Sequence, residues 1–252
     1  MTVPDKSLAT LNFGLVPGTE FNPLSLQPVF LFDGLSTPVW KDIGRTVPAT
    51  ADGDVVAAID DSSGSGNHLI GRMATYSTSG VYRTHGQANG AYSLKGVPST
   101  GYYGPFWSDN PVHIPNDFTT FVVRKYTAAG EFRGLLYGGA AQVRTFINDN
   151  FRVQDGVGAN HYSTTPVSKG SYVVDMVRLS GATCEWKENG VSFGIDATMD
   201  TTARPDGSVY FSETYMGFGE NAHVVFMCII PAAITSDNEA AMLAYLRARF
   251  AI

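Results

Sequence analysis

One segment of the sequence, residues 59–69, has the composition of a cation site. Asp60, Asp61 and Asn67 stand among glycines and serines there, and Ca²⁺ binds several oxygen ligands on a bent backbone. The segment lacks the alternating carboxylates and the final bidentate glutamate of an EF-hand, and no second histidine or cysteine lies near His68 at zinc-ligand spacing. The sequence therefore favours a tight surface turn. A calcium site at the three residues is the alternative, and no other cofactor is expected.

The densest aromatic cluster in the chain, at residues 101–107, is a second candidate site. Tyrosine and tryptophan offer flat amphipathic surface that both sugar rings and protein partners contact. The favoured interpretation is a group of loop aromatics folded over the edge of the domain. The alternative is a ligand or partner surface, made by Tyr102, Tyr103, Phe106 and Trp107.

The glutamates do not show the spacing of a glycosidase active site. A retaining glycosidase needs two carboxyl groups about 5 to 5.5 Å apart, which a strand supplies from alternate residues. Glu185 and Glu188 differ by three positions and so point to opposite faces of a strand, while Glu213 and Glu220 flank a segment without alternation. The chain also lacks Gly-x-Ser-x-Gly, Gly-Lys phosphate-loop and His-Glu-x-x-His motifs. The sequence predicts no catalytic residues and no enzymatic activity.

Composition predicts one all-β domain. The 252 residues are 44% hydrophobic and only 16% charged, with 27 glycines and 13 prolines, a mixture typical of many short strands joined by tight turns. A net charge of -6 without a basic cluster argues against nucleic acid as the main partner. With no apolar run of 18 residues and no signal-peptide pattern at residues 1–10, we expect a soluble protein made in a cytoplasm.

The strands that must position any site are clearest in the middle of the chain. A two-residue Asn189-Gly190 turn joins the alternating segments 184–188 and 191–195, which is a strong hairpin signal. Cys184 and Cys228 lie within apolar strand patterns and are interpreted as small buried hydrophobes, with a disulfide as the minority alternative. Further strands are predicted at residues 29–33, 118–125, 131–138, 142–148, 150–154 and 172–179.

The end of the chain predicts a buried strand followed by one amphipathic helix. Residues 224–230 are apolar at every position, which is typical of a strand covered on both faces. Ser236 and Glu239 have the spacing of a capping box that opens a helix. The helix is expected to bury an apolar stripe of Met242, Leu243, Leu246 and Phe250 against the sheets.

Residues 1–28 are expected to form an extended N-terminal arm, because prolines interrupt every short apolar group. Five large apolar residues give this arm something to bury, so we expect it to dock on its own domain or on a neighbouring subunit. They are Phe13, Leu15, Phe21, Leu24 and Leu26.

Three blocks together resemble the concanavalin A-like (laminin-G-like) jelly-roll modules of tailed-bacteriophage structural proteins. They are residues 21–33, residues 60–68, which are similar to an Asp-x-Ser-Gly-x-Gly-Asn-His turn, and residues 234–247. The hairpin at residues 186–195 resembles the family's strand with an Asn-Gly turn, whereas residues 32–34 depart from the usual Trp-Leu-Asp-Ala run. The resemblance covers most of the chain and implies a two-sheet antiparallel jelly-roll sandwich over residues 29–252, with the short helix beside it.

This resemblance implies a non-enzymatic structural protein of a tailed-phage virion, such as a head decoration protein, head fibre or tail-associated subunit. Such a protein would lie at the virion surface after synthesis in the host cytoplasm, bind other virion subunits through its arm, and form homo-oligomers such as trimers. The alternative is a lectin-like module for a host surface glycan, and a glycoside hydrolase is a distant third. Neither nucleic acid nor a membrane is an expected partner.

Overall fold

The structure, a computed structural model, describes residues 21–71, 81–84, 87–96, 106–108, 117–126, 146–148, 150–154, 159–200 and 222–252. The strands are β1 (Phe30–Asp33), β2 (Val39–Trp40), β3 (Val55–Val56), β4 (Ala58–Ile59), β5 (Leu69–Gly71), β6 (Val81–Thr84), β7 (Ser93–Gly96), β8 (Phe106–Ser108), β9 (Phe118–Tyr126), β10 (Phe146–Asn148), β11 (Asn150–Gln154), β12 (Asn160–Pro166), β13 (Val173–Ser180), β14 (Thr183–Glu188), β15 (Val191–Asp196) and β16 (Ala222–Ile230). The helices are the 3-10 turns η1 (Pro23–Leu26) and η2 (Ala88–Gly90) and the α-helix α1 (Ser236–Phe250).

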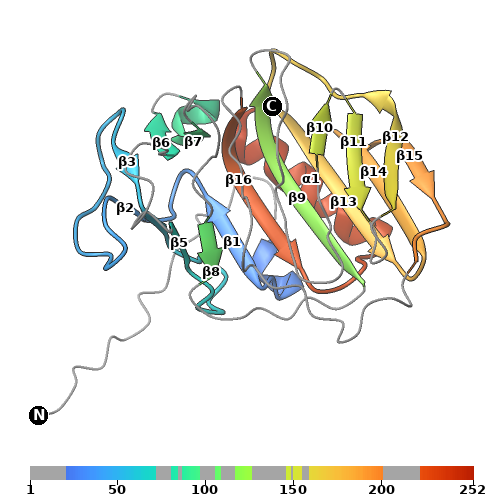
Figure 1. Cartoon of the computed structure of the whole chain (residues 1–252), viewed down its shortest axis with the longest axis horizontal. Helices are drawn as coiled ribbons and strands as arrows, with labels where there is room; N and C mark the ends of the chain where they lie inside the picture. Colours follow the sequence, from blue (N-terminus) through green and yellow to red (C-terminus); the bar gives the residue numbers. More distant parts are fainter. Residues whose placement is uncertain are drawn as a thin grey trace, which may run out of the picture.

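A large antiparallel sheet is the centre of the fold. Its strands run in the order β15-β14-β13-β9-β16-β7-β6-β3, and β1 also pairs with β16. Two smaller antiparallel sheets, β10-β11-β12 and β2-β4-β5-β8, accompany it. Figure 1 shows α1 behind the large sheet and β10, β11 and β12 in front of it. The predicted all-β jelly-roll sandwich with one C-terminal helix is confirmed, and its second layer is divided between the two small sheets.

Two apolar cores lie on opposite faces of the large sheet. Phe118 and Val122 of β9 share one core with Val153 of β11 and with Ile59 and Leu69 of the other small sheet. The odd-numbered β9 residues point the other way, because successive side chains of a strand alternate between faces. They join the second core, which is built with α1 and includes Phe121, Val123, Met242, Leu246 and Phe250.

β16 is covered on both faces, as its apolar sequence predicts. It pairs with β9 along one edge and with β1 and β7 along the other. Met227 and Ile229 point into the core shared with the small sheets, whereas Phe226 and Cys228 point toward α1. Cys184 belongs to the opposite core from Cys228, and both side chains are buried without a disulfide between them, which confirms their interpretation as small hydrophobes.

α1 spans the predicted range, but its N-cap differs by one residue. The hydroxyl of Thr235 accepts a hydrogen bond from the Asn238 backbone N–H at 3.3 Å, and Ser236 is already the first helical residue. The predicted capping box is therefore wrong, because the Glu239 carboxylate turns away from the helix start and reaches the sheet instead. Of the predicted apolar stripe, Leu243 is only partly buried, and Tyr245 takes part in the core in addition.

The structure describes only residues 21–28 of the predicted arm, and these residues pack on their own domain. The amide oxygen of Asn22 accepts a hydrogen bond from Leu24 N–H at 3.0 Å and caps the 3-10 turn η1. Phe21, Leu24 and Leu26 contact the core that contains α1, with the Phe21 ring 6.2 Å from that of Tyr245. This part of the arm is thus a folded turn and not an extended hook. The other two predicted docking residues, Phe13 and Leu15, lie outside the described residues.

Candidate functional site

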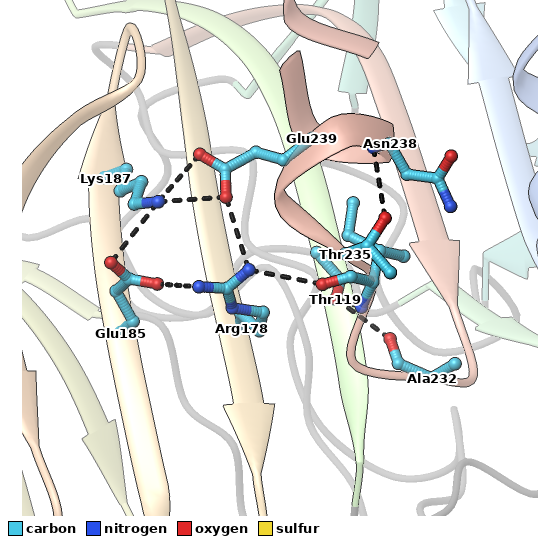
Figure 2. Close-up of polar contacts among 9 residues, drawn as sticks. Thr119, Arg178, Glu185, Lys187, Ala232, Thr235, Asn238 and Glu239 are labelled. Atoms are coloured by element: carbon cyan, nitrogen blue, oxygen red, sulfur yellow. Dashed lines mark hydrogen bonds and ion pairs between the residues drawn. The ribbon is translucent and has the colours of Figure 1, made fainter. Parts of the chain in front are cut away.

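A network of four charged side chains joins the large sheet to the first turn of α1. Arg178 of β13 lies directly opposite Glu185 of β14, and Lys187 lies two residues further along the same strand. Residues opposite one another on neighbouring strands share a face of the sheet, and here that face is the one that α1 covers. Glu239 of α1 reaches down to both cations from the helix, as Figure 2 shows.

Each carboxylate of this network contacts both cations. The Lys187 ammonium donates to the two oxygens of Glu239 at 2.8 and 2.9 Å and lies 3.3 Å from Glu185. The Arg178 guanidinium donates to Glu185, to Glu239 at 3.3 Å and to the carbonyl oxygen of Ile234 at 3.2 Å. Two positive and two negative charges lie together, so the network is neutral.

A hollow of about 400 Å³ opens beside this network. Its volume lies in the lower part of the range of roughly 300 to 1,000 Å³ that is typical of small-molecule sites. Arg178 and Glu185 supply charged groups, and Ile195 of β15 supplies an apolar side chain that is 65% exposed. The remaining lining residues are Ser180, Thr183 and Ala233.

The lining suits a ligand that carries hydroxyl groups on a compact carbon frame. A carboxylate accepts hydrogen bonds from hydroxyls, and a guanidinium donates to their oxygens through any of its five N–H groups. Three described acceptors use Arg178 Nη1 and Nη2, which leaves further donors on the same side chain. An exposed Ile195 beside these groups offers a surface for carbon-bound hydrogens. The arrangement therefore combines polar recognition with apolar contact.

A second charged cluster lies on the opposite face of the sheet and is sealed from solvent. Arg124 of β9 is 1% exposed and donates to Asp175 at 2.6 and 2.9 Å and to Glu188 at 2.9 Å. Burial, with a smaller contribution from Glu188, raises the pKa of Asp175 to about 7, although Arg124 opposes the shift. Because no ligand can reach these groups without opening the core, their role is structural. As the sequence predicts, Glu185 and Glu188 lie on opposite faces of β14.

A second hollow, of about 330 Å³, lies near β2 and is lined by uncharged residues. Leu35, Pro38 and Pro48 are among them, together with Tyr92, whose hydroxyl donates to the Thr37 carbonyl. This hollow has hydroxyl groups but no charged side chain, unlike the hollow beside Arg178, and we regard it as the weaker candidate.

Residues 60–67 form a turn in which the Asp61 carboxylate accepts hydrogen bonds from the backbone of the protein. Asp61 accepts hydrogen bonds from the backbone N–H groups of Leu31, Ser63 and Asn67 at 2.8 to 3.0 Å. The Asn67 side-chain amide donates to the Val29 carbonyl at 2.7 Å. Asp60 lies 3.3 Å from His68. These contacts favour the structural turn over the calcium alternative, and the described residues contain no cluster of three or more metal-binding side chains.

The predicted aromatic surface is only partly described. Tyr102 and Tyr103 lie outside the described residues. Phe106 and Trp107 belong to β8, where they pair with Gly71 and Ile70 of β5. This pairing places them on the edge strand of the four-stranded sheet, away from the strands that carry the charged network.

In the part of the chain that the structure describes, no helix has the length and apolarity needed to cross a membrane.

Comparison with known proteins shows the fold and no family. No family model and no curated protein matches the chain. Among solved structures, an arabinofuranosidase complexed with arabinofuranosyl-alpha-1,2-xylobiose has a TM-score of 0.59 at 12% identity, over 91% of this chain and 65% of that one. A GH54 α-L-arabinofuranosidase has a TM-score of 0.56 at 12% identity, over 91% and 66%. The chain thus aligns with slightly less than two thirds of each enzyme.

A third structure, the binding domain of botulinum neurotoxin serotype D, has a TM-score of 0.46 at 9% identity, over 88% of this chain and 52% of that one. This likeness is too low to support an argument. The phage family that the sequence resembles is not represented among these matches.

Two structures that share this fold, both named as arabinofuranosidases, contradict the prediction that excluded enzymatic activity. That prediction rested on the spacing of two carboxylates within a single strand. The structure brings Glu185 of β14 beside Glu239 of α1 through their shared contacts with Lys187. No spacing rule within one strand finds a pair that is built from a strand and a distant helix.

Proposed function

We propose that this chain is a carbohydrate-binding β-sandwich and that the hollow beside Arg178 and Glu185 holds the sugar. The observation that carries the proposal is the combination, in one hollow of about 400 Å³, of a guanidinium, a carboxylate and the exposed Ile195 side chain. Sugar rings present hydroxyl groups at their edges and carbon-bound hydrogens on their faces, so they match both parts of this lining. The fold likeness to two arabinofuranosidases supports this class of ligand.

A glycan array tests the proposal. The wild-type chain is expected to bind a set of glycans, and Ile195→Asp should abolish that binding because it replaces the apolar contact by a charge. Val191→Asp is the matched control, since Val191 lies on the same strand, is 64% exposed and does not line the hollow. A blank array for the wild-type chain, or equal binding by all three proteins, would contradict the proposal.

A second candidate function is glycoside hydrolysis, favoured by the convergence of Glu185 and Glu239 on the same two cations. Hydrolysis with retention needs two carboxyl groups about 5 to 5.5 Å apart. Arabinofuranosyl-xylobiose is a suitable probe, with release of free arabinose measured by chromatography. Hydrolysis that is lost in both Glu185→Gln and Glu239→Gln would support this candidate. Activity that persists in both variants, or none in the wild-type chain, would argue against it.

A tailed-phage virion is the setting that the sequence resemblance supports for such a module. Sugar recognition at a virion surface would serve attachment to a host, with other copies of the chain and other virion subunits as neighbours. Antibodies against the chain should then label intact particles in immuno-electron microscopy. Labelling of the soluble fraction alone would contradict the virion setting and leave the sugar-binding proposal intact.

A further inference from the structure

Three basic residues lie side by side across three strands of the large sheet. Lys95 of β7 pairs with His223 of β16, and His223 pairs with Lys125 of β9. Residues directly opposite one another in antiparallel strands point to the same face and approach closely. The two lysines therefore flank the histidine on a single face, which is the face that also carries α1.

This basic row lies apart from the hollow beside Arg178. Phe226, three residues after His223, contacts the ring of Phe250 at a centroid distance of 5.9 Å, so the row lies toward the C-terminal end of α1. The Arg178 network contacts Ile234 and Glu239, at the opposite end of that helix. The two features are separated by the length of α1 and need separate explanations.

The two lysines have no anionic partner in the described part of the chain. Both are half-buried, and neither forms an ion pair with a described carboxylate. The Lys125 ammonium instead lies 5.9 Å from the centre of the Tyr172 ring, a weak cation–π distance. The two lysines lie on either side of His223, each opposite that residue and not opposite one another. Within the described residues no carboxylate neutralises their two charges, and a bound anion would do so.

The histidine between the lysines is held in place by a buried hydroxyl. The Nδ1 atom of His223 lies 2.9 Å from the Oγ atom of Ser93, which is fully buried on β7. Burial, and then the charges of Lys95 and Lys125, lower the pKa of His223. A neutral imidazole whose Nδ1 is engaged by this hydroxyl leaves Nε2 for another partner. The contact with Ser93 therefore fixes the orientation of the imidazole at the centre of the basic row.

We propose that Lys95, His223 and Lys125 form a binding site for an oxyanion group, such as a sulfate, a phosphate or a carboxylate. Two ammonium groups in register supply the charge and several donors, and the imidazole lies between them. Hydrogen bonds between ionised groups are about twice as strong as neutral ones, so a small anion placed here gains from both lysines. The site is independent of the neutral sugar hollow.

Titration calorimetry of the full chain with sodium sulfate, sodium phosphate and sodium acetate, at a constant ionic strength set by sodium chloride, tests this site. Saturable binding of at least one anion is expected, and comparison of the three distinguishes a tetrahedral from a planar group. Lys95→Gln and Lys125→Gln should each weaken that binding by about tenfold, the effect of one lost charge-assisted hydrogen bond. Lys41→Gln is the control, because Lys41 pairs with Asp54 at 2.6 Å elsewhere in the chain.

A second measurement uses only the wild-type chain, so it does not require that the lysine variants fold. Proton NMR of the wild-type chain follows the His223 imidazole, whose pKa should rise when the bound anion offsets the charges of Lys95 and Lys125. No saturable binding of any of the three anions would overturn the proposal. So would an unchanged affinity in both lysine variants, or a His223 pKa that does not respond to the anion.

Discussion

Glu239 in the first turn of α1 and Lys187 in β14 form an ion pair, with the ammonium 2.8 and 2.9 Å from the two carboxylate oxygens. The pair fixes the start of the helix on the large sheet, beside the hollow that we assign to the sugar. Glu239→Gln should lower the free energy of unfolding by about 1 to 3 kcal/mol, because two cations lose a charged acceptor. Chemical denaturation measures the change. Asp237→Asn, an exposed residue in the same turn, should have little effect.

Leu246 is the central apolar contact between α1 and the sheet, with no exposed surface. Leu246→Ala should lower the free energy of unfolding by about 2 to 5 kcal/mol through lost burial and a cavity. Leu243→Ala should have a smaller effect, since Leu243 is only partly buried. An unchanged melting temperature for Leu246→Ala would mean that the helix is not packed on this sheet.

Gly190 in the hairpin turn contacts the helix as well as shaping the turn. Its φ is +81°, and a Cβ atom there would lie 2.7 Å from Leu243 Cδ2. Gly170→Ala is the matched control, because Gly170 has a φ of +85° but open space around the added atom. The left-handed conformation costs about 1 to 2 kcal/mol in both variants, and Gly190→Ala should be further destabilised by the contact. Equal melting temperatures for the two variants would contradict this added cost and would mean that the Leu243 side chain moves aside freely.

Asp175 gives the stability of the fold a dependence on pH. Because its pKa rises from 3.8 to about 7 on folding, the folded state binds the proton more tightly than the unfolded state. The contribution of the protonated Asp175 carboxyl group to the free energy of unfolding is therefore complete below about pH 4 and is lost as pH rises through about 7. The free energy of unfolding should fall over this window by up to about 1.4 kcal/mol per pH unit.

Denaturation midpoints between pH 4 and 8 measure this dependence, and Asp175→Asn should remove it. Glu188→Gln should shift the window to lower pH, because the neighbouring negative charge is one cause of the raised pKa. An Asp175→Asn chain whose stability changes with pH in the same way as that of the wild-type chain would contradict the assignment of the proton to this buried carboxyl group.

The parts of the fold that the sequence predicts well are those where local pattern and packing agree. The strand at β16 and the helix α1 have a run of apolar residues and a clear apolar stripe, and both are found as expected. The Asn189-Gly190 turn is also found, with φ values of 52° and 81°. β12 was missed because His161 and Ser163, its buried residues, are polar and hide the alternation.

The candidate site could not be predicted in the same way, because its members are distant in the sequence. Glu239 has the spacing of a capping residue, yet the cations on β13 and β14 attract its carboxylate and Thr235 caps the helix instead. Lys95, His223 and Lys125 are likewise brought together only by strand register. For that reason these three residues do not form a basic cluster in the sequence.

An NMR titration of the ¹⁵N-labelled chain with the glycan that gives the strongest array signal locates the bound sugar. We expect the amide signals that shift to cluster at the lining of the hollow, at Arg178, Glu185 and Ile195. Shifts that cluster at Tyr92 in the second hollow, or an absence of shifts at saturating glycan, would contradict this placement of the sugar.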